Sequence, residues 1–220
     1  MKRTIFQTLI VIGVMFIFQM PLFSSADETI PSSVLNAAQE GVKIFFKDTK
    51  VTDLYRFGFS SREEADAATL GKGFQVFTVP PDSLLKEGIS KDFNSLAVST
   101  TLWEFIVVSG GKAKVLLSVD LMSGKWTPVG IGAAGLAKEI SKALETWPVS
   151  AGYQHKLIRV YQATSDFLRV SSGEKVSGIL PFTSARMAMD LRERGFDPLD
   201  LYNSKDVLSR IRPVVRKNIQ

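Results

Sequence analysis

Three apolar runs joined by two glycine turns constrain the fold more than any other feature of this 220-residue sequence. The runs are LWEFIVV (102–108), AKVLLSVDL (113–121) and WTPVGIG (126–132), and they are rich in β-branched and aromatic residues. The connections are Ser-Gly-Gly-Lys and Ser-Gly-Lys, and such short glycine turns join strands that pair antiparallel. The segment is therefore predicted to be a three-stranded meander whose middle strand is buried on both faces.

A second hairpin pattern follows a helical stretch. Strands are predicted over 156–163, 166–170 and 175–182, and an earlier one over 74–79. Apolar residues at helical spacing, with polar caps before them and glycine or proline after them, predict the helices. The predicted helices cover 33–47, 61–70, 82–87, 136–147, 183–194 and 204–212. We therefore predict an α+β fold, with helices packed on a mostly antiparallel sheet of about six strands.

The N-terminus has the layout of a secretory signal peptide. A basic Lys-Arg start precedes an apolar run over 9–18, and the small residues Ser-Ser-Ala at 24–26 suit a signal peptidase. We expect cleavage after Ala26 and export to the periplasm or the cell exterior. The alternative is an uncleaved membrane anchor, because the apolar residues at 22–23 can lengthen the run.

The predicted organisation is a signal peptide over 1–26 and one exported domain over 27–220. Its core covers about 33–212, and the tail after Pro213 is expected to fray because proline ends most helices. The chain also contains two strand-strand-helix rounds, which end near Trp147 and Gly195. Their similarity is too short to decide whether the domain arose by duplication.

Composition excludes several classes of function. The sequence contains no cysteine, which rules out disulfides, thiolate metal sites and a cysteine nucleophile. Removing residues 1–26 takes away two basic residues and no acid, which lowers the formal charge from +5 to +3. Basic and acidic residues are interleaved over most of the chain, so we predict no nucleic-acid binding.

The sequence shows no serine-hydrolase pattern. A serine nucleophile needs a general base, and His155 is the single histidine. No G-x-S-x-G motif accompanies it. We therefore predict that His155 stands at the entry to a strand and faces solvent.

Clustered acids have structural explanations. Ser60 and Ser61 followed by Glu63 and Glu64 have capping-box spacing, so these acids and Asp66 are predicted to begin a helix that ends before Gly71 and Gly73. The acids in FDPLDLY (196–202) are predicted to be turn residues. No metal site is predicted from either cluster.

Two acids inside apolar strands are the strongest candidates for chemistry. Glu104 and Asp120 each lie between apolar neighbours, and a pair of carboxylates is what glycoside hydrolysis requires. Period-two alternation offers a simpler account, in which both side chains point outward from the sheet. We favour the structural account and assign no catalytic, cofactor-binding or metal-binding residue.

The stretch GIGAAG (130–135) matches the spacing of a dinucleotide-binding turn. That turn needs a buried strand before it and an acid about 20 residues after it. Here Pro128 interrupts the strand, and no acid lies between Glu145 and Asp166. We predict no nucleotide cofactor; instead, Gly130 and Gly132 form a tight corner and Gly135 lets the next helix pack closely on the sheet.

The C-terminal region is basic. It carries Lys205, Arg210, Arg212, Arg216 and Lys217 against a single acid in the same helix. We interpret these residues as an ordinary solvated helix face, with weak or no membrane contact.

The segment DFLRVSSGEKVSGILPF (166–182) resembles the hairpin of propeptide domains from streptopain-type cysteine proteases. In that hairpin a strand, a polar turn and an Ile-Leu-aromatic strand follow one another. The resemblance covers under a tenth of the chain, and it implies a fold used for inhibition or for packing against a partner.

The sequence as a whole predicts an exported, non-catalytic protein that binds a protein or another ligand of the cell envelope. An inhibitor or chaperone-like module for an exported enzyme is the first alternative. An exported hydrolase that uses Glu104 or Asp120 is the second, and it would need a deep pocket around one of these acids.

Overall fold

The computed structural model describes residues 29–47, 49–86, 92–173, 175–191 and 197–219. The predicted signal peptide lies outside these residues. Within them, no helix combines the length and the apolar character needed to cross a membrane.

One mixed sheet runs through the chain, with the strand order β4-β3-β2-β1-β5-β6-β7. Its strands are β1 Thr69–Thr78, β2 Val98–Ser109, β3 Lys112–Met122, β4 Lys125–Gly132, β5 Tyr153–Val160, β6 Ser165–Ser172 and β7 Lys175–Pro181. The α+β class is confirmed, but the sheet has seven strands rather than about six. Every neighbouring pair is antiparallel except β1 and β5, which are parallel. No hairpin turn links these two, so turn chemistry could not reveal their pairing.

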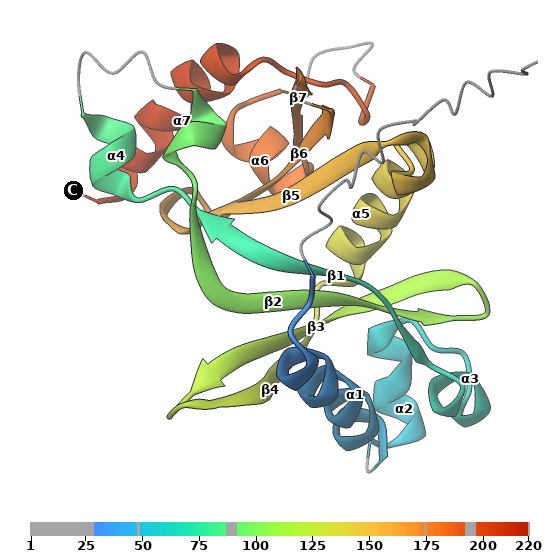
Figure 1. The fold of residues 1–220 in the computed structure, drawn as a ribbon. Coiled ribbons are helices and arrows are strands. Elements are labelled where there is room, and N and C mark those ends of the chain that lie inside the picture. The colour runs from blue at the N-terminus through green and yellow to red at the C-terminus, as the bar shows by residue number, and fades with distance from the viewer. Residues whose placement is uncertain (1–28, 48, 87–91, 174, 192–196, 220) are drawn as a thin grey trace, which may run out of the picture.

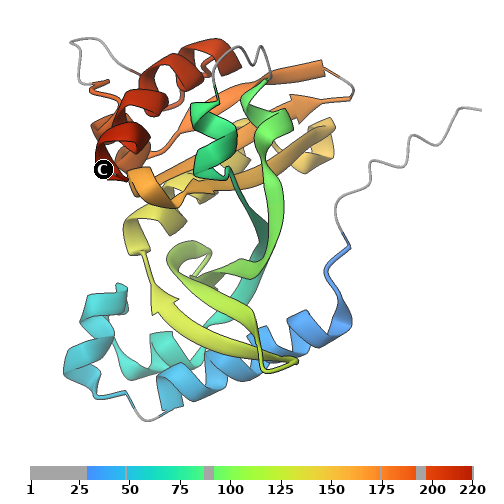
Figure 2. The same cartoon turned by 90° about the vertical axis from the view of Figure 1, so that its left-hand side faces the viewer.

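Helices cover both faces of the sheet. They are α1 Ser32–Lys47, α2 Val51–Leu54, α3 Arg62–Asp66, α4 Pro81–Leu85, α5 Ala134–Thr146, α6 Thr183–Ala188 and α7 Ser204–Asn218. Short 3₁₀ turns lie at Tyr55–Phe57, Phe93–Leu96, Val149–Ala151 and Tyr161–Ala163. In Figures 1 and 2, α1 to α3 gather at the β2–β4 end and α4 and α7 at the β5–β7 end, while β1 and β2 run between the two ends.

The core has three parts, which follow from the alternation of side chains along the strands. Phe105, Val107 and Leu117 pack with α1 and α3 on one face, whereas their neighbours Ile106 and Leu116 pack with α5 on the other. A third cluster joins the β5–β7 end to α4, α6 and α7. The middle strand β3 is thus buried on both faces, as the sequence predicts.

The segment after the capping box differs from the prediction. Helix α3 ends at Asp66, and Gly71 and Gly73 lie inside β1 rather than terminating a helix. A Cβ atom at Gly73 would lie 2.5 Å from the ring of Phe105, so this strand position has no room for a side chain. The glycines therefore mark close packing against β2, where the register also shifts.

The last helix is longer than predicted. Pro213 lies inside α7, which continues to Asn218, so the expected end at residue 212 and the frayed tail are both wrong. Val207, Ile211 and Val215 are fully buried and follow one another at four-residue spacing. Burial of Val215 beyond the proline offsets the lost backbone hydrogen bond, which is why the helix passes through Pro213.

The corner after β4 is also built differently. Ala133 takes the left-handed conformation, with φ of 51°, while Gly130, Gly132 and Gly135 do not. A Cβ at Gly135 would meet no atom within 4 Å, so the predicted close packing of this glycine is wrong. The helical glycine that does pack closely is Gly41 of α1, where a Cβ would lie 2.7 Å from Cβ of Pro128.

Helix α6 ends at Ala188 rather than near residue 194, and Asp190 lies in the left-handed region just after it. Neither Thr183 nor Ser184 is its N-cap residue, which is Phe182. Glu139 of α5 accepts hydrogen bonds from the backbone nitrogen and hydroxyl of Thr183 instead. The cap thus comes from a distant helix, which local spacing could not predict.

Candidate functional site

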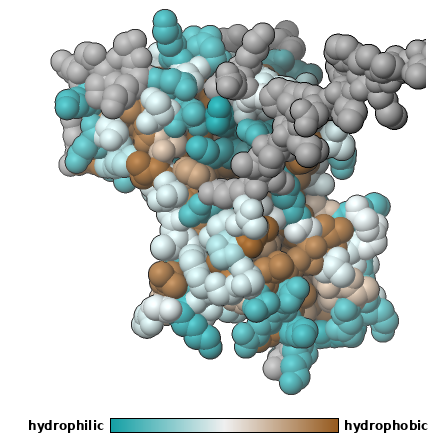
Figure 3. Space-filling view, viewed as in Figure 1, coloured by the Kyte–Doolittle hydropathy of each residue, from teal (hydrophilic) through white to brown (hydrophobic). Residues whose placement is uncertain are grey.

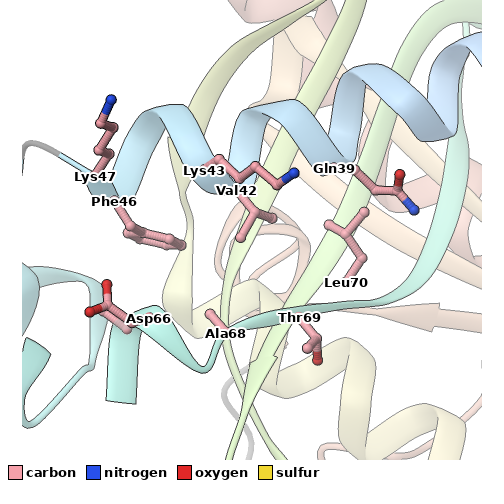
Figure 4. A pocket seen from close by; sticks show the side chains of 10 residues that line it. Gln39, Val42, Lys43, Phe46, Lys47, Asp66, Ala68, Thr69 and Leu70 are labelled. Atoms are coloured by element: carbon pink, nitrogen blue, oxygen red, sulfur yellow. The ribbon is translucent and has the colours of Figure 1, made fainter. Parts of the chain in front are cut away.

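A groove between α1 and the α3–β1 segment is the candidate site. It has a volume of about 660 Å³. Its lining residues are Gln39, Val42, Lys43, Phe46, Lys47, Ala65, Asp66, Ala68, Thr69 and Leu70. Figure 4 shows Val42 and Phe46 pointing from α1 toward the strand, and Leu70 pointing back toward the helix.

The groove has an apolar centre and a polar rim. Phe46 and Ala65 are buried, and Val42, Ala68 and Leu70 are half-buried. Lys43, Lys47 and Asp66 are exposed around them. Apolar surface also reaches solvent among hydrophilic residues over the part of the molecule that contains α1 to α3 (Figure 3). A concave apolar surface with a few charges at its edge is the usual form of a binding site.

Arg62 fixes the two walls of the groove relative to each other. Its Nη1 atom donates a 2.6 Å hydrogen bond to the carbonyl oxygen of Phe46 at the end of α1. Its Nη2 atom donates to the carbonyl oxygen of Thr49. Arg62 is the first residue of α3, so one guanidinium satisfies carbonyls at the end of α1 and joins the two helices.

The capping box holds the start of α3, as predicted. The hydroxyl of Ser61 accepts a hydrogen bond from the Glu64 nitrogen, and the Glu64 carboxylate accepts one from the Ser60 nitrogen. Lys114 of β3 adds a 2.5 Å ion pair to Glu64. The pKa of Glu64 is lowered below its ordinary value, mainly by the hydrogen bond that Lys114 donates to its carboxylate and next by the one from the Ser60 nitrogen. The acids of this helix therefore have structural partners, and Asp66 lies 3.8 Å from Arg62.

Glu104 does not point to solvent, which corrects the alternation argument. It is 4% exposed and pairs with Arg159 of β5 at 3.2 Å, while Ser118 donates a 2.9 Å hydrogen bond to it. Arg159 also binds Asp166 at 2.7 Å. Burial is the main cause that raises the pKa of Glu104, and the positive charge of Arg159 opposes it. The counter-charge comes from the other half of the sheet, so period-two spacing could not reveal it.

Asp120 is half-buried and accepts a hydrogen bond from the Leu121 nitrogen. Neither Asp120 nor Glu104 is among the residues that line the groove. His155 is half-buried in β5, opposite Val170, rather than exposed at the strand entry as predicted. The structure therefore brings none of these three residues to the groove.

The remaining candidates keep their structural roles. Asp197 accepts a hydrogen bond from the Leu199 nitrogen, as expected for a turn residue. No group of three or more acids or histidines that could hold a metal occurs among the described residues. In the basic helix α7, Arg212 donates to the Leu84 carbonyl oxygen, and Lys205, Arg210, Arg216 and Lys217 are exposed.

Comparison with protein-family models, with curated proteins and with solved structures finds no match for the chain in any of the three. The candidate site therefore depends on the geometry alone.

Sequence reasoning missed the groove because its walls come from separate segments. Val42 and Phe46 belong to the apolar face of the helix predicted over 33–47, and the sequence pattern does not show which segment lies against that face. The sequence pattern predicts Leu70 at the end of a helix, but Leu70 is the second residue of β1, which passes beneath α1. Only the crossing of these two elements creates the groove.

Proposed function

We propose that this protein is an exported, non-catalytic binding protein that holds an apolar polypeptide segment in the groove between α1 and the α3–β1 segment. One observation carries the proposal: Val42, Phe46 and Leu70 form a concave apolar surface that remains open beside charged residues. Export is supported by the predicted signal peptide over 1–26.

The groove's dimensions and charges favour a particular partner. A volume of about 660 Å³ suits a few apolar side chains rather than a whole domain face. Lys43 and Lys47 lie along the α1 edge of the groove. Asp66 is the acid among the lining residues, and it lies near Arg62. The partner segment should therefore present apolar side chains with acidic residues beside them, because opposite charges guide and orient association.

A hydrolase has less support from the geometry. The Glu104 carboxylate is 4% exposed, pairs with Arg159 and Ser118, and does not line the groove, so a ligand held in the groove would not reach it. A binding role does not require this carboxylate. The hydrogen bonds of Arg62 to both walls also suit a groove that must keep its shape while it holds a ligand.

A peptide titration tests the proposal. Short labelled peptides with a central Leu-Phe pair would be flanked by glutamate in one series and by lysine in another, and binding would be followed by fluorescence anisotropy. We expect the glutamate series to bind more tightly. Val42→Asp should weaken its binding about tenfold, equivalent to about 1.4 kcal/mol, because a carboxylate would enter the apolar centre.

Ile44→Asp is the matched control. Ile44 lies on the same helix, is 53% exposed and does not line the groove. Its replacement adds the same charge to α1 and should leave peptide affinity within about twofold of wild type, since surface changes outside an interface have small effects. Equal losses in the two variants would show that helix charge, rather than the groove, controls binding.

A further inference from the structure

The first part of β1 is an open strand edge. Strand β1 pairs with β2 from Thr69 onward, but it pairs with β5 only over Val76–Thr78. None of the described residues forms a backbone hydrogen bond with Thr69, Leu70 or Gly71 on the side of β1 that faces away from β2. Successive residues of a strand direct their N–H and C=O groups to opposite sides, so this edge presents backbone donors and acceptors to an incoming chain.

The open edge forms one side of the groove. Thr69 and Leu70 both line it, and Figure 4 shows Leu70 pointing toward α1 while Thr69 points away from the helix. A strand added beside β1 would place the residue opposite Leu70 on the same face as Leu70. That side chain would enter the apolar centre formed with Val42 and Phe46, so one segment would satisfy both the edge and the apolar surface.

The length of the groove fits a short strand. On the α1 side its lining residues run from Gln39 to Lys47, which corresponds to about 12 Å of helix. An extended chain covers this length with about four residues. An α-helix would need about eight residues for the same length, which is about twice the bulk, in a volume of about 660 Å³. The register of β1 with β2 shifts after Leu70, and this also limits regular pairing on the open edge to a few residues.

The lysines at the rim indicate the charge of the strand. Lys43 and Lys47 are exposed and lie one helical turn apart on α1. Side chains one turn apart have Cβ atoms about 6 Å from each other, close to the distance of about 7 Å between alternate residues of a strand. Asp66, the acid among the lining residues, already lies 3.8 Å from Arg62. The rim therefore favours carboxylates on the incoming strand.

We propose that the groove holds its partner by strand addition, in which an extended segment pairs with the open edge of β1 at residues 69–71. The segment places an apolar side chain beside Leu70, and an acidic residue two positions away lies on the same face, toward Lys43 and Lys47. This inference rests on the proposed function, because it specifies how the same groove holds its polypeptide. The backbone of the partner becomes a recognised group, so many sequences with this pattern should bind.

Single backbone N-methyl groups on the peptide test strand addition without altering the protein. Each amide of the glutamate-flanked Leu-Phe peptide would be methylated in turn, and affinity would be measured by fluorescence anisotropy. Because an extended chain turns alternate N–H groups toward its neighbour, methylation should weaken binding at every second residue. We expect a loss of about five- to tenfold at those residues, as for one lost hydrogen bond, and of less than about twofold at the residues between them.

The outcomes separate this inference from the proposed function. Tolerance of every methyl group would show that side chains alone are recognised, and equal losses at all positions would indicate a bound helix. Either result would overturn strand addition and leave the groove as a binding site. Failure of the unmethylated peptide to bind would contradict the proposed function, and this inference with it.

Amide hydrogen exchange of the protein gives an independent measurement. At a peptide concentration ten times the dissociation constant, exchange should slow about tenfold at the amides of residues 69–71 that face away from β2. The amides on the outer edge of β4 are the control, because β4 is the last strand of the sheet on its side and does not line the groove. Unchanged exchange at residues 69–71 with the peptide bound would overturn strand addition, and so would equal slowing on both edges.

Discussion

Replacing Gly41 with alanine tests how closely α1 packs on the sheet. The new Cβ would lie 2.7 Å from Cβ of Pro128 and 3.0 Å from Cδ1 of Leu117. Carbon atoms in contact are normally about 3.5–4.0 Å apart, so α1 would have to retreat by about 1 Å. Overpacking of this kind costs about 1–3 kcal/mol. Alanine also gains about 1 kcal/mol over glycine in helix propensity, so the net loss should be up to about 2 kcal/mol.

Gly135→Ala is the matched comparison, because it makes the same chemical change in another helix. A Cβ at Gly135 would meet no atom within 4 Å. Alanine there should stabilise the fold by up to about 1 kcal/mol through helix propensity. The two variants remove the same backbone freedom from the unfolded chain, so their difference isolates the packing of Gly41.

Urea unfolding followed by circular dichroism measures both changes. Gly41→Ala should be less stable than Gly135→Ala by about 1–3 kcal/mol. In thermal unfolding this corresponds to about 2–4 °C for each kcal/mol in a domain of this size. Equal stabilisation of both variants would refute the close crossing of α1 over β4. Loss of stability in Gly135→Ala would instead restore the packing role that the sequence predicted for Gly135.

Three further predictions follow from individual residues. Burial raises the pKa of Glu104 in the folded state, so its contribution to stability is greatest below its ordinary pKa and is lost as pH rises through the raised value. The wild type should therefore gain stability over Glu104→Gln as pH falls from neutral toward 4 in urea titrations, and a pH-independent difference would contradict this. Ala133 has φ of 51°, a left-handed conformation that costs alanine more than glycine, so Ala133→Gly should stabilise the protein by about 1 kcal/mol. A loss of stability measured by calorimetry would exclude a left-handed residue at this position. Val215→Ala should lower the free energy of unfolding by about 1–3 kcal/mol, because the Val215 side chain is fully buried. Lys217→Ala is the comparison, and an equal loss of stability in the two variants would indicate a frayed tail.

The predictable part of the fold is the part encoded by neighbours in sequence. The hairpins of β2–β4 and β6–β7 were predicted because their turns lie between the strands they join. The parallel pairing of β1 with β5 was missed because the two strands are separated by the whole β2–β4 meander and α5. The passage of α7 through Pro213 was missed for a related reason, since burial of Val215 in the core outweighs a local helix-breaking signal.

The candidate site was less predictable than the fold. Period-two alternation placed Glu104 on a strand correctly, but it could not identify Arg159 as the partner that keeps a buried carboxylate in place. Likewise, the apolar face of the first helix was visible in the sequence, whereas its partial exposure depends on where β1 crosses it. Both features arise from contacts between distant segments, which single-sequence patterns do not contain.

Photo-crosslinking in the cells that make the protein tests the binding groove most directly. A benzoylphenylalanine side chain would replace Val42 inside the groove or, as control, Ile44 on the exposed side of α1. The account predicts that position 42 gives a discrete adduct whose crosslinked peptide has apolar residues beside acids, and that position 44 does not. The same adducts from both positions, or a crosslinked peptide without apolar residues, would contradict a polypeptide-binding groove.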